Sequence, residues 1–305
     1  MRIFITGATG YIGFAVATAF AAKGHEVFGL VRSEEKAKKV AATEVKPVIG
    51  NMNDPESYIE IASSCQLLIH CASEMSAQFH ALDQKTIETL IKIANASNLQ
   101  RSIIYTSGTW LYGNTGNNLA NESSKLNPPA FIKPRQEVEN KILQSTNSRL
   151  STLIIRPGCV YGGAGGLTAS WFESANKKGK ATIVGDGNFH WAMIHIQDLA
   201  DLYVRAGESY LTGQIFNATD HSRSTIFECA KSASRIAGKS EAVQTISISE
   251  ATKTLGTMAE CLTLDQQVDS GKAIQLLGWR PRHNGFVDGI ERYFIAWKSL
   301  QPNAK

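Results

Sequence analysis

The sequence predicts an α/β protein with a doubly wound parallel sheet, and two observations carry this prediction. Short apolar segments typical of buried strands alternate with amphipathic segments of helical period as far as residue 157. The chain has 305 residues, of which 43% are apolar and 19% charged, as in ordinary globular proteins. This length suits one large α/β unit with a smaller appendage.

The alternation begins with a strand over Arg2–Thr6 and a helix over Tyr11–Ala22, which ends at Lys23-Gly24, a common helix stop signal. A later helix starts at Asn53-Asp54-Pro55, where an acidic cap precedes a proline in the first turn. The remaining apolar runs predict strands over 26–31, 45–49, 66–70, 102–106 and 151–156, and helices over 81–97 and 134–144.

After Pro157 the pattern loosens into glycine-rich loops, with a short strand over 181–184 and helices over 197–207 and 224–238. We therefore expect two domains. Residues 1–157 form the first, and residues 158–305 form a smaller C-terminal α/β domain that binds the substrate. The boundary is blurred, because chain segments are expected to cross back between the two.

The charge balance predicts no nucleic-acid or membrane partner. Lys and Arg number 31 against 27 Asp and Glu, which gives a net charge of +4. So mild an excess is equally well explained by an anionic small ligand. Nothing in the sequence indicates an oligomeric state.

The cysteines predict neither a disulfide framework nor a metal site. The five lie at positions 65, 71, 159, 229 and 261, without a CxxC pair or a histidine at metal-ligand spacing. A reducing compartment fits, and we expect a cytoplasmic protein. The apolar stretch from Ile3 to Ala22 is interrupted by regularly spaced glycines, so it is interpreted as a strand and helix rather than a signal peptide.

A glycine-rich loop follows the first strand directly. It reads TGATGYIG over Thr6–Gly13, with glycines three residues apart and a helix that starts inside the motif. Glycine lets the backbone approach a pyrophosphate closely, and a helix N-terminus offers free N–H groups to its charge. The alternative is a turn that serves only helix–strand packing. The sequence predicts dinucleotide contacts from Gly7, Thr9, Gly10, Tyr11 and Ile12.

The residue after the second strand bears on the choice of dinucleotide. NAD-binding folds carry a carboxylate there, about 20 residues after the loop, whereas this chain has Arg32. A guanidinium pairs with a 2′-phosphate that a carboxylate would repel. We therefore expect NADP(H) rather than NAD(H). The alternative is that Arg32 merely begins the solvated run 32–39.

Further motifs, in their order along the chain, resemble the extended or atypical short-chain dehydrogenase/reductases. That family has a Rossmann fold and includes sugar-nucleotide epimerases, dehydratases and related carbonyl reductases. The motifs are NMND (51–54), IHCA (69–72), YTS (105–107), RPGCVYG (156–162), GDG (185–187), HIQDLA (195–200) and LGWRP (277–281). The resemblance implies cofactor contacts from Asn51, Met52, Cys71, Ala72, Arg135, Pro157, Gly158 and Val160.

The chain departs from this family at its catalytic positions. Phe131 stands where the family has a tyrosine proton donor, Arg135 where a lysine lowers the pKa of that tyrosine, and Gly108 where a serine orients the substrate oxygen. Phe131 cannot titrate, although Arg135 can still hold a ribose. We expect Thr109 and Tyr112 to be catalytic instead. Tyr161, His190 and His195 are further candidate donors, and all five also suit packing or capping roles.

A second departure concerns the substrate. The family usually has an arginine for a diphosphate four residues before the histidine of HIQD, and this chain has Trp191 there. With Phe189 and His190 beside it, Trp191 favours a flat or apolar small molecule. The alternative is that Trp191 packs between the domains.

The sequence therefore predicts an NADP(H)-dependent oxidoreductase that acts on a small carbonyl or alcohol substrate. Two other functions stay open: a catalytically silent dinucleotide sensor or scaffold, and an epimerase or dehydratase of a sugar derivative.

Overall fold

The computed structural model describes residues 1–73, 79–96, 99–220, 222–237 and 240–301. Its contacts divide the chain into two compact units, each assembled from three stretches. Unit 1 comprises Met1–Ser107, Pro134–Arg156 and Ala200–Phe216, and unit 2 comprises Gly108–Lys133, Pro157–Leu199 and Asn217–Lys305. The sequence-based boundary is at residue 157, and residues 108–133 and 200–216 belong to the unit on the other side of it.

Unit 1 is built on a seven-stranded sheet within the described residues, in the order β11-β7-β5-β4-β1-β2-β3. Every neighbouring pair from β7 to β3 is parallel. The chain order reverses between β1 and β4, which makes the sheet doubly wound, as the sequence predicts. The strands are β1 (Arg2–Thr6), β2 (Glu26–Val31), β3 (Lys46–Ile49), β4 (Leu67–His70), β5 (Arg101–Thr106), β7 (Leu150–Pro157) and β11 (Gln214–Ala218).

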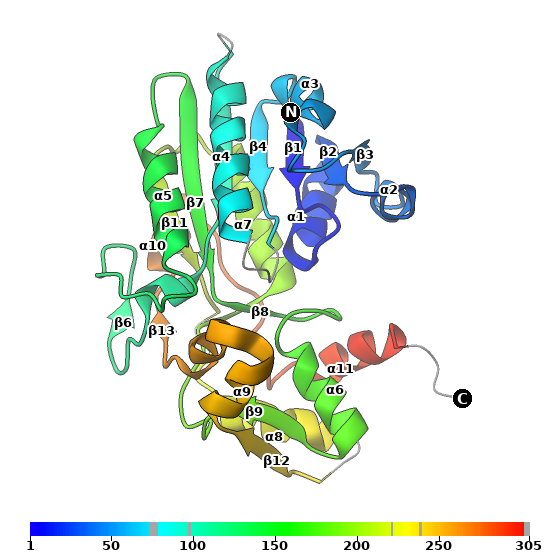
Figure 1. The fold of residues 1–305 in the computed structure, drawn as a ribbon, viewed down its shortest axis with the longest axis vertical. Helices are drawn as coiled ribbons and strands as arrows, with labels where there is room; N and C mark the ends of the chain where they lie inside the picture. The colour runs from blue at the N-terminus through cyan, green and yellow to red at the C-terminus, as the bar shows by residue number, and fades with distance from the viewer. Residues whose placement is uncertain (74–78, 97–98, 221, 238–239, 302–305) are drawn as a thin grey trace. The chain divides into compact units, whose positions relative to one another are not determined.

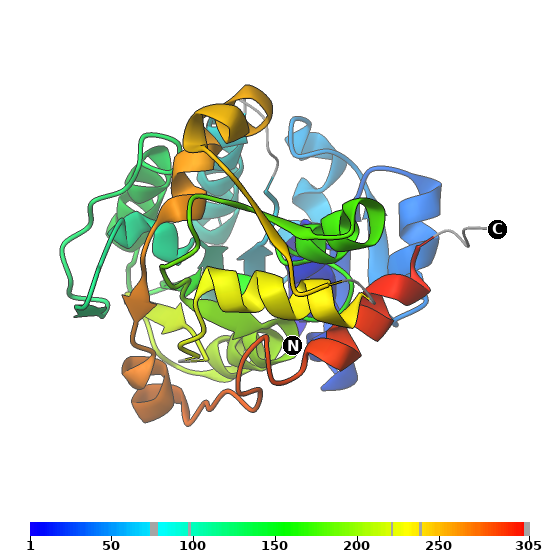
Figure 2. The ribbon, with the colours of Figure 1, turned by 90° about the horizontal axis from the view of Figure 1, so that it is seen from below.

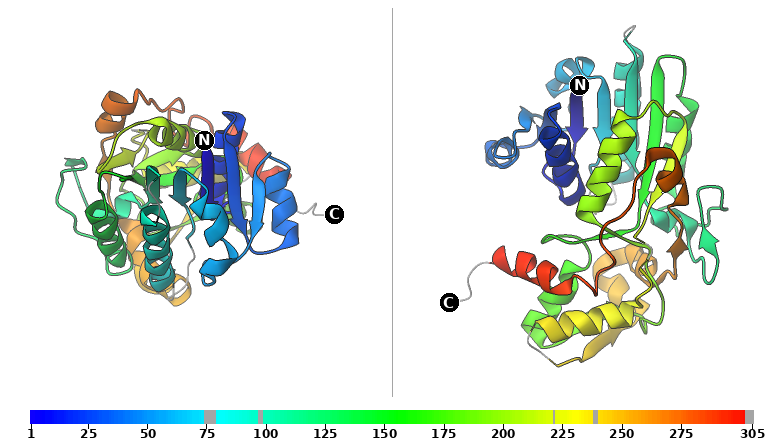
Figure 3. Two further views of the ribbon diagram at one scale, coloured as in Figure 1. Left: turned by 90° about the horizontal axis from the view of Figure 1, so that it is seen from above. Right: turned by 180° about the vertical axis from the view of Figure 1, so that it is seen from behind.

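Helices cover both faces of this sheet, as the opposite views of Figure 1 and the right panel of Figure 3 show. One face carries α3 (Ile59–Ser63), α4 (Phe79–Asn95) and α5 (Pro134–Gln144), and the other carries α1 (Tyr11–Ala22) and the part of α7 (Ile196–Glu208) that belongs to unit 1. Ile3, Phe4 and Ile5 are all fully buried, because a parallel sheet with helices on both sides exposes neither face.

Two elements of unit 1 differ from the prediction. Helix α2 (Glu34–Ala41) occupies the charged run that reads as solvated, and Ser33 caps it by accepting from the N–H of Lys36. The helix expected from Asn53 is a short 3-10 turn, Pro55–Ser57, followed by α3. The predicted end of the 81–97 helix lies outside the described residues.

Unit 2 contains three small parallel strand pairs among its described residues. They are β8 (Cys159–Tyr161) with β10 (Met193–His195), β9 (Ala181–Val184) with β12 (Val243–Ile246), and β6 (Leu119–Ala120) with β13 (Gln267–Val268). Its longer helices, α6 (Ala169–Lys178), α8 (Ile226–Ile236) and α11 (Ile290–Ser299), group together in Figure 2. Shorter helical segments complete it: Thr109–Tyr112, α9 (Ile248–Leu255), Gly256–Thr263 and α10 (Gly271–Leu277).

Helices of the described residues are all too short or too polar to cross a membrane.

Candidate functional site

The glycine loop of unit 1 closes tightly on itself. Gly7 has φ +75°, and a Cβ on it would lie 2.6 Å from the main-chain nitrogen of Ala72. A Cβ on Gly13 would lie 2.2 Å from the carbonyl oxygen of Gly7. Only glycine fits at these two positions, because the loop, the start of α1 and the end of β4 pack backbone to backbone.

Gly10 is different, because packing does not require it. It is exposed, with φ −75°, and a Cβ there would meet nothing nearer than the Gly7 oxygen at 3.2 Å. Gly10 is the N-cap of α1 and offers no side chain to the first turn, which contains no acidic residue. The helix therefore presents its N-terminal N–H groups and the positive end of its dipole beside an open glycine, which fits a bound phosphate.

Around this loop lie the other predicted residues of the segment. Thr9 is half-buried, and Tyr11 and Ile12 are the first two residues of α1. Lys39 on α2 donates from Nζ to the carbonyl oxygen of Thr9 at 3.4 Å. Helix α2 appears in the sequence only as a charged run. It places the positive charge of Lys39 next to the loop, in addition to the positive end of the α1 dipole.

Arg32 follows β2 directly and is exposed, one residue before the Ser33 cap of α2. Asn51 and Met52 follow β3. Asn51 accepts from the N–H of Asn53 at 3.0 Å, and the half-buried Met52 packs against the core. All three predicted cofactor contacts therefore stand at the carboxyl ends of neighbouring parallel strands, where ligands bind in such sheets.

Cys71 and Ala72 continue the chain beyond β4. The hydroxyl of Thr106 donates to Cys71 Sγ at 3.2 Å and shares a hydrogen bond with the Tyr203 hydroxyl at 2.6 Å. Burial raises the pKa of the Cys71 thiol to about 12. Cys71 is therefore a neutral packing group whose main chain lies against Gly7.

A buried polar network that the sequence does not reveal lies where β1, β4 and β5 meet. Asp83 on α4 accepts from His70 Nε2 at 2.8 Å and from the Tyr105 hydroxyl at 2.6 Å, and His70 Nδ1 lies 2.5 Å from the Thr6 hydroxyl. A carboxylate only accepts, so His70 donates through Nε2. Burial alone would raise the pKa of Asp83, but the bond to His70 and the charges of His70 and Arg135 hold it below its usual value.

Arg135 on α5 brings its charge to the carboxyl end of β5. Its Nη1 donates to the carbonyl oxygens of Thr106 at 3.0 Å and Ser107 at 3.3 Å. Two buried polar atoms here have no hydrogen-bond partner among the described residues, Arg135 Nε and Ser107 Oγ. Unused buried donors are costly, so this pair fits a ligand that supplies an acceptor. Ser107 is absent from our predicted sites, although it directly precedes Gly108.

Thr109 and Tyr112, the predicted catalytic residues, are buried in unit 2. The Thr109 hydroxyl donates to Gln266 Oε1 at 3.3 Å, and the Tyr112 hydroxyl donates to Asn217 Oδ1 at 2.8 Å. Each hydroxyl is thus held by a side-chain amide. Phe131 lies in a turn before α5.

Pro157, Gly158 and Val160 also belong to unit 2. The N–H of Gly158 donates to the carbonyl of Ala218 at 3.0 Å, and a Cβ on Gly158 would lie 2.4 Å from the Ala192 oxygen. Packing inside unit 2 thus requires this glycine. Val160 pairs with Ile194 of β10.

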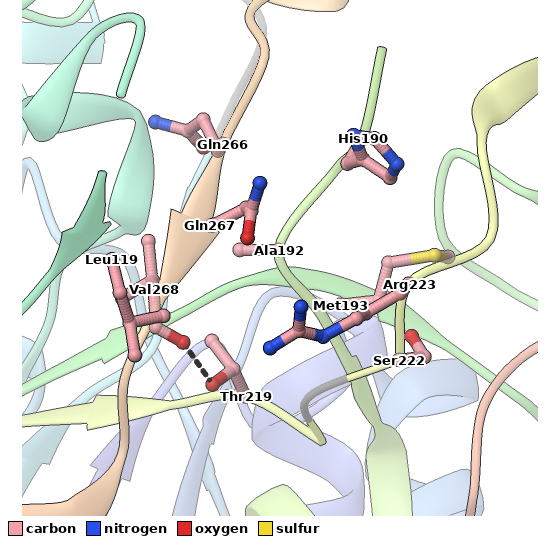
Figure 4. A pocket seen from close by; sticks show the side chains of 10 residues that line it. All are labelled: Leu119, His190, Ala192, Met193, Thr219, Ser222, Arg223, Gln266, Gln267 and Val268. Carbon is pink, nitrogen blue, oxygen red and sulfur yellow. Dashed lines mark hydrogen bonds between the residues drawn. The ribbon is translucent and has the colours of Figure 1, made fainter. Parts of the chain in front are cut away.

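A pocket of about 370 Å³, its open mouth included, lies in unit 2 (Figure 4). Of the three aromatic residues that favour a flat substrate, only His190 lines it. Trp191 instead stacks on Trp171 with ring centroids 5.5 Å apart, and Phe189 packs in the same core. Trp191 therefore packs in the core of unit 2 and does not line this pocket. The lining residues are Leu119, His190, Ala192, Met193, Thr219, Ser222, Arg223, Gln266, Gln267 and Val268.

Tyr161 and His195, two further candidate donors, are poor acids. The Tyr161 hydroxyl donates to Asp220 at 2.6 Å, and burial together with that carboxylate raises its pKa strongly. Burial and the neighbouring His283 lower the pKa of His195 to about 3, so near neutrality this imidazole is uncharged and lacks the acidic proton of an imidazolium.

His195, Asp198 and His283 bring potential metal ligands within 4.8 Å of one another, which the sequence spacing does not indicate. The two imidazoles are stacked with centroids 3.5 Å apart and planes 17° apart, so their in-plane lone pairs do not converge. Oδ2 of Asp198 already accepts from His283 Nδ1 at 2.9 Å and from two main-chain N–H groups. This cluster therefore fits loop packing.

Three relatives span much of the chain. An uncharacterized protein of Schizosaccharomyces pombe is 32% identical over 96% of this chain and 100% of its own length. The 3-diazoavenalumate denitrifying reductase of a Streptomyces species is 25% identical over 96% of this chain and 100% of its own. A 4-hydroxy-2-methyl-3-oxo-4-farnesyl-3,4-dihydroquinoline-1-oxide ketoreductase of Stigmatella aurantiaca is 26% identical over 72% of this chain and 68% of its own.

Solved structures share the fold. UDP-glucuronic acid 4-epimerase from Bacillus cereus, in complex with UDP-glucuronic acid and NAD, superposes with a TM-score of 0.82 at 17% identity over 99% of this chain and 100% of its own. A family model described as NAD dependent epimerase/dehydratase matches residues 3–219. The match begins in β1 and includes the glycine loop, the carboxyl end of β5 and α5, so the chain belongs to the NAD-dependent epimerase/dehydratase family.

Proposed function

We propose that this protein is an NADP(H)-dependent reductase of small carbonyl compounds that works without the tyrosine donor usual in such enzymes. The observation that carries the proposal is the pair of unused buried donors, Ser107 Oγ and Arg135 Nε, at the carboxyl end of β5. Two of the relatives are named reductases, which supports reduction rather than epimerisation.

The residues of unit 1 fit a dinucleotide. Gly10 leaves the N-terminus of α1 open, and Gly7 and Gly13 let the loop close beneath it. Arg32 stands where a 2′-phosphate is distinguished from a hydroxyl, and Lys39 adds a positive charge beside Thr9. These features support NADP(H) as the cofactor.

When bound, the reduced nicotinamide supplies a hydride to the carbonyl carbon of the substrate. The hydroxyl of Ser107 donates a hydrogen bond to the carbonyl oxygen, and the guanidinium of Arg135 stabilises the negative charge that develops on that oxygen. Water provides the proton that completes the alcohol. Thr109 and Tyr112 remain the second pair to test as donors.

The test is NADPH oxidation by the full chain with small aldehydes, ketones and quinones. We expect slow turnover that Ser107→Ala lowers by about tenfold or more, since loss of one well-placed polar group commonly costs that much. Thr109→Val and Tyr112→Phe serve as comparison variants. If Thr109→Val or Tyr112→Phe loses turnover while Ser107→Ala keeps it, the catalytic group is Thr109 or Tyr112, as the sequence predicts, and not Ser107.

A second candidate function is a catalytically silent dinucleotide sensor. Phe131 supports it, because this residue places no titratable group at the usual donor position of the family. Tight NADPH binding measured by calorimetry, without oxidation of NADPH by any carbonyl compound, would establish that function instead.

A further inference from the structure

Arg223 gives the pocket of unit 2 a definite charge preference. It belongs to the loop between β11 and α8, and Figure 4 shows its guanidinium extending toward the middle of the lining residues. The side chain is exposed, and within the described ranges no carboxylate pairs with it. The residues that line the pocket also include no acidic side chain. Arg223 is therefore the permanently charged residue of the pocket lining.

Most other polar groups of the lining are already used. Gln266 Nε2 donates to the carbonyl oxygens of Thr109 at 2.8 Å and Gly113 at 2.9 Å, and the Thr219 hydroxyl donates to the carbonyl of Val268 at 2.8 Å, the bond drawn in Figure 4. These bonds fix the walls of the pocket. Arg223 and His190 are among the groups that these bonds leave available to a ligand.

His190 is held in place for such a contact. Its Nδ1 lies 3.2 Å from Asp265 Oδ1, and its main-chain N–H donates to the same oxygen at 2.8 Å. Since the carboxylate only accepts, Nδ1–H of His190 donates to it, and Nε2 is the ring nitrogen left for a ligand. The main chain of His190 forms a bridge with Thr225, which fixes the loop that carries Arg223 beside it.

Two acidic residues beside this loop have hydrogen-bond partners of their own. Asp265 is engaged with His190, and Asp220 accepts from the Tyr161 hydroxyl at 2.6 Å and from the N–H of Ser222 at 2.9 Å. Burial raises the pKa of Asp220, and the hydrogen bonds from Tyr161 and Ser222 oppose that rise. Neither acid therefore occupies the guanidinium.

We propose that this pocket binds small organic carboxylates and that Arg223 makes it bind them in preference to neutral ligands. Leu119, Ala192, Met193 and Val268 contribute an apolar surface for the hydrocarbon part of such a ligand. One step rests on the reductase function proposed above: the substrate of that reductase is a carbonyl compound that also carries a carboxylate. The enclosed part of the pocket is small, about 30 Å³, so it takes the carboxylate group while the rest of the ligand lies at the open mouth.

The kinetic experiment compares para-carboxybenzaldehyde with its neutral methyl ester as substrates of the full chain with NADPH. Arginine binds a carboxylate through a two-pronged fork, but an exposed ion pair is weakened by water. We therefore expect Arg223→Gln to raise the KM for the acid by about fivefold to tenfold, with the KM for the ester unchanged. Arg223→Lys, which keeps charge without the fork, should fall between.

Arg280→Gln is the matched control. It removes the same charge from another exposed arginine of unit 2, outside the pocket lining, and should leave both KM values unchanged. Because Arg223 is exposed, its variants should melt within a degree or so of wild type. Calorimetry with NADPH should give the same affinity for all variants, since the cofactor residues of unit 1 are untouched.

A binding measurement keeps the inference independent of turnover. In ligand-observed NMR on the full chain, benzoate should give transfer signals that Arg223→Gln removes and Arg280→Gln does not, whereas benzamide should give none that depend on Arg223. Equal benzoate signals in wild type and Arg223→Gln would overturn the carboxylate site. If benzoate binding depends on Arg223 but neither aldehyde is reduced, the reductase proposal fails and the carboxylate site stands. If both aldehydes are reduced with KM values that Arg223→Gln leaves alone, the carboxylate site fails and the reductase stands.

Discussion

Arg135 donates to the main-chain oxygen of Thr106 at 3.0 Å, which fixes a positive charge at the carboxyl end of β5. Four residues later on the same helix, Glu139 pairs with Arg156 of β7, with Arg156 Nε 2.9 Å from Glu139 Oε1. Both residues are buried. The face of α5 that carries Arg135 is therefore the face that packs on the sheet. This supports the alignment of Arg135 with the lysine position of the short-chain dehydrogenase/reductases.

Rebuilding the usual proton relay should raise activity. We expect Phe131→Tyr combined with Arg135→Lys and Gly108→Ser to increase carbonyl reduction by about tenfold or more, since a positioned acid commonly contributes at least that. Gly108 has extended backbone, φ −177°, and a Cβ there would meet only the Pro157 oxygen at 3.9 Å, so serine fits. Steady-state kinetics would check the triple variant. The double variant without Phe131→Tyr is its control and should gain nothing.

NADPH should bind at least about tenfold more tightly than NADH, because Arg32 can pair with the 2′-phosphate. Calorimetry on wild type, Arg32→Ala and Lys38→Ala would measure this. Arg32→Ala should lose the preference for NADPH, whereas Lys38→Ala, an exposed change on α2, should keep it. Equal affinities for both dinucleotides in wild type would contradict the assignment.

The glycines of the loop should respond differently to substitution. Gly10→Asp places an anion at the open start of α1, so it should abolish dinucleotide binding while the protein still folds. Gly13→Ala should instead destabilise the fold by about 2 kcal/mol or more, because its Cβ would lie 2.2 Å from the Gly7 oxygen. Thermal melting without cofactor and calorimetry with NADPH separate the two effects. A Gly10→Asp variant that still binds would sink the phosphate-loop assignment.

Acid should weaken the fold through Asp83. Its pKa is held below the usual value in the folded protein, so the stability it contributes is present above its unfolded pKa of about 4 and is lost as the pH falls through the lower folded value. Asp83→Asn should lower the free energy of unfolding near neutrality by about 3 kcal/mol, as for other broken buried pairs. Urea unfolding at neutral and acidic pH should show a smaller acid-induced loss in Asp83→Asn than in wild type. An identical loss in both proteins would show that Asp83 does not titrate with folding.

The sheet could be predicted because its strands are continuous apolar runs, and Arg2–Thr6, Tyr11–Ala22 and Pro134–Gln144 have the bounds that the sequence indicates. Helix α2 escaped because its mean composition is charged and only Ala37 and Val40 are buried. The Asp83 network and the Ser107–Arg135 pair join residues distant in sequence, which no local pattern records. The sequence could not place Trp191, because an aromatic side chain suits a pocket and a core equally; in the structure it stacks on Trp171.

Unit 1 is assembled from three separate stretches of the chain, and this affects how it folds during synthesis. β11 is the outermost strand of the sheet beside β7, and it is contributed by Gln214–Ala218. Until those residues leave the ribosome, β7 remains an unprotected sheet edge, open to pairing with another nascent chain. Production of fragments that stop before residue 214 should therefore yield aggregates, and chaperones that shield strand edges should matter most in that interval.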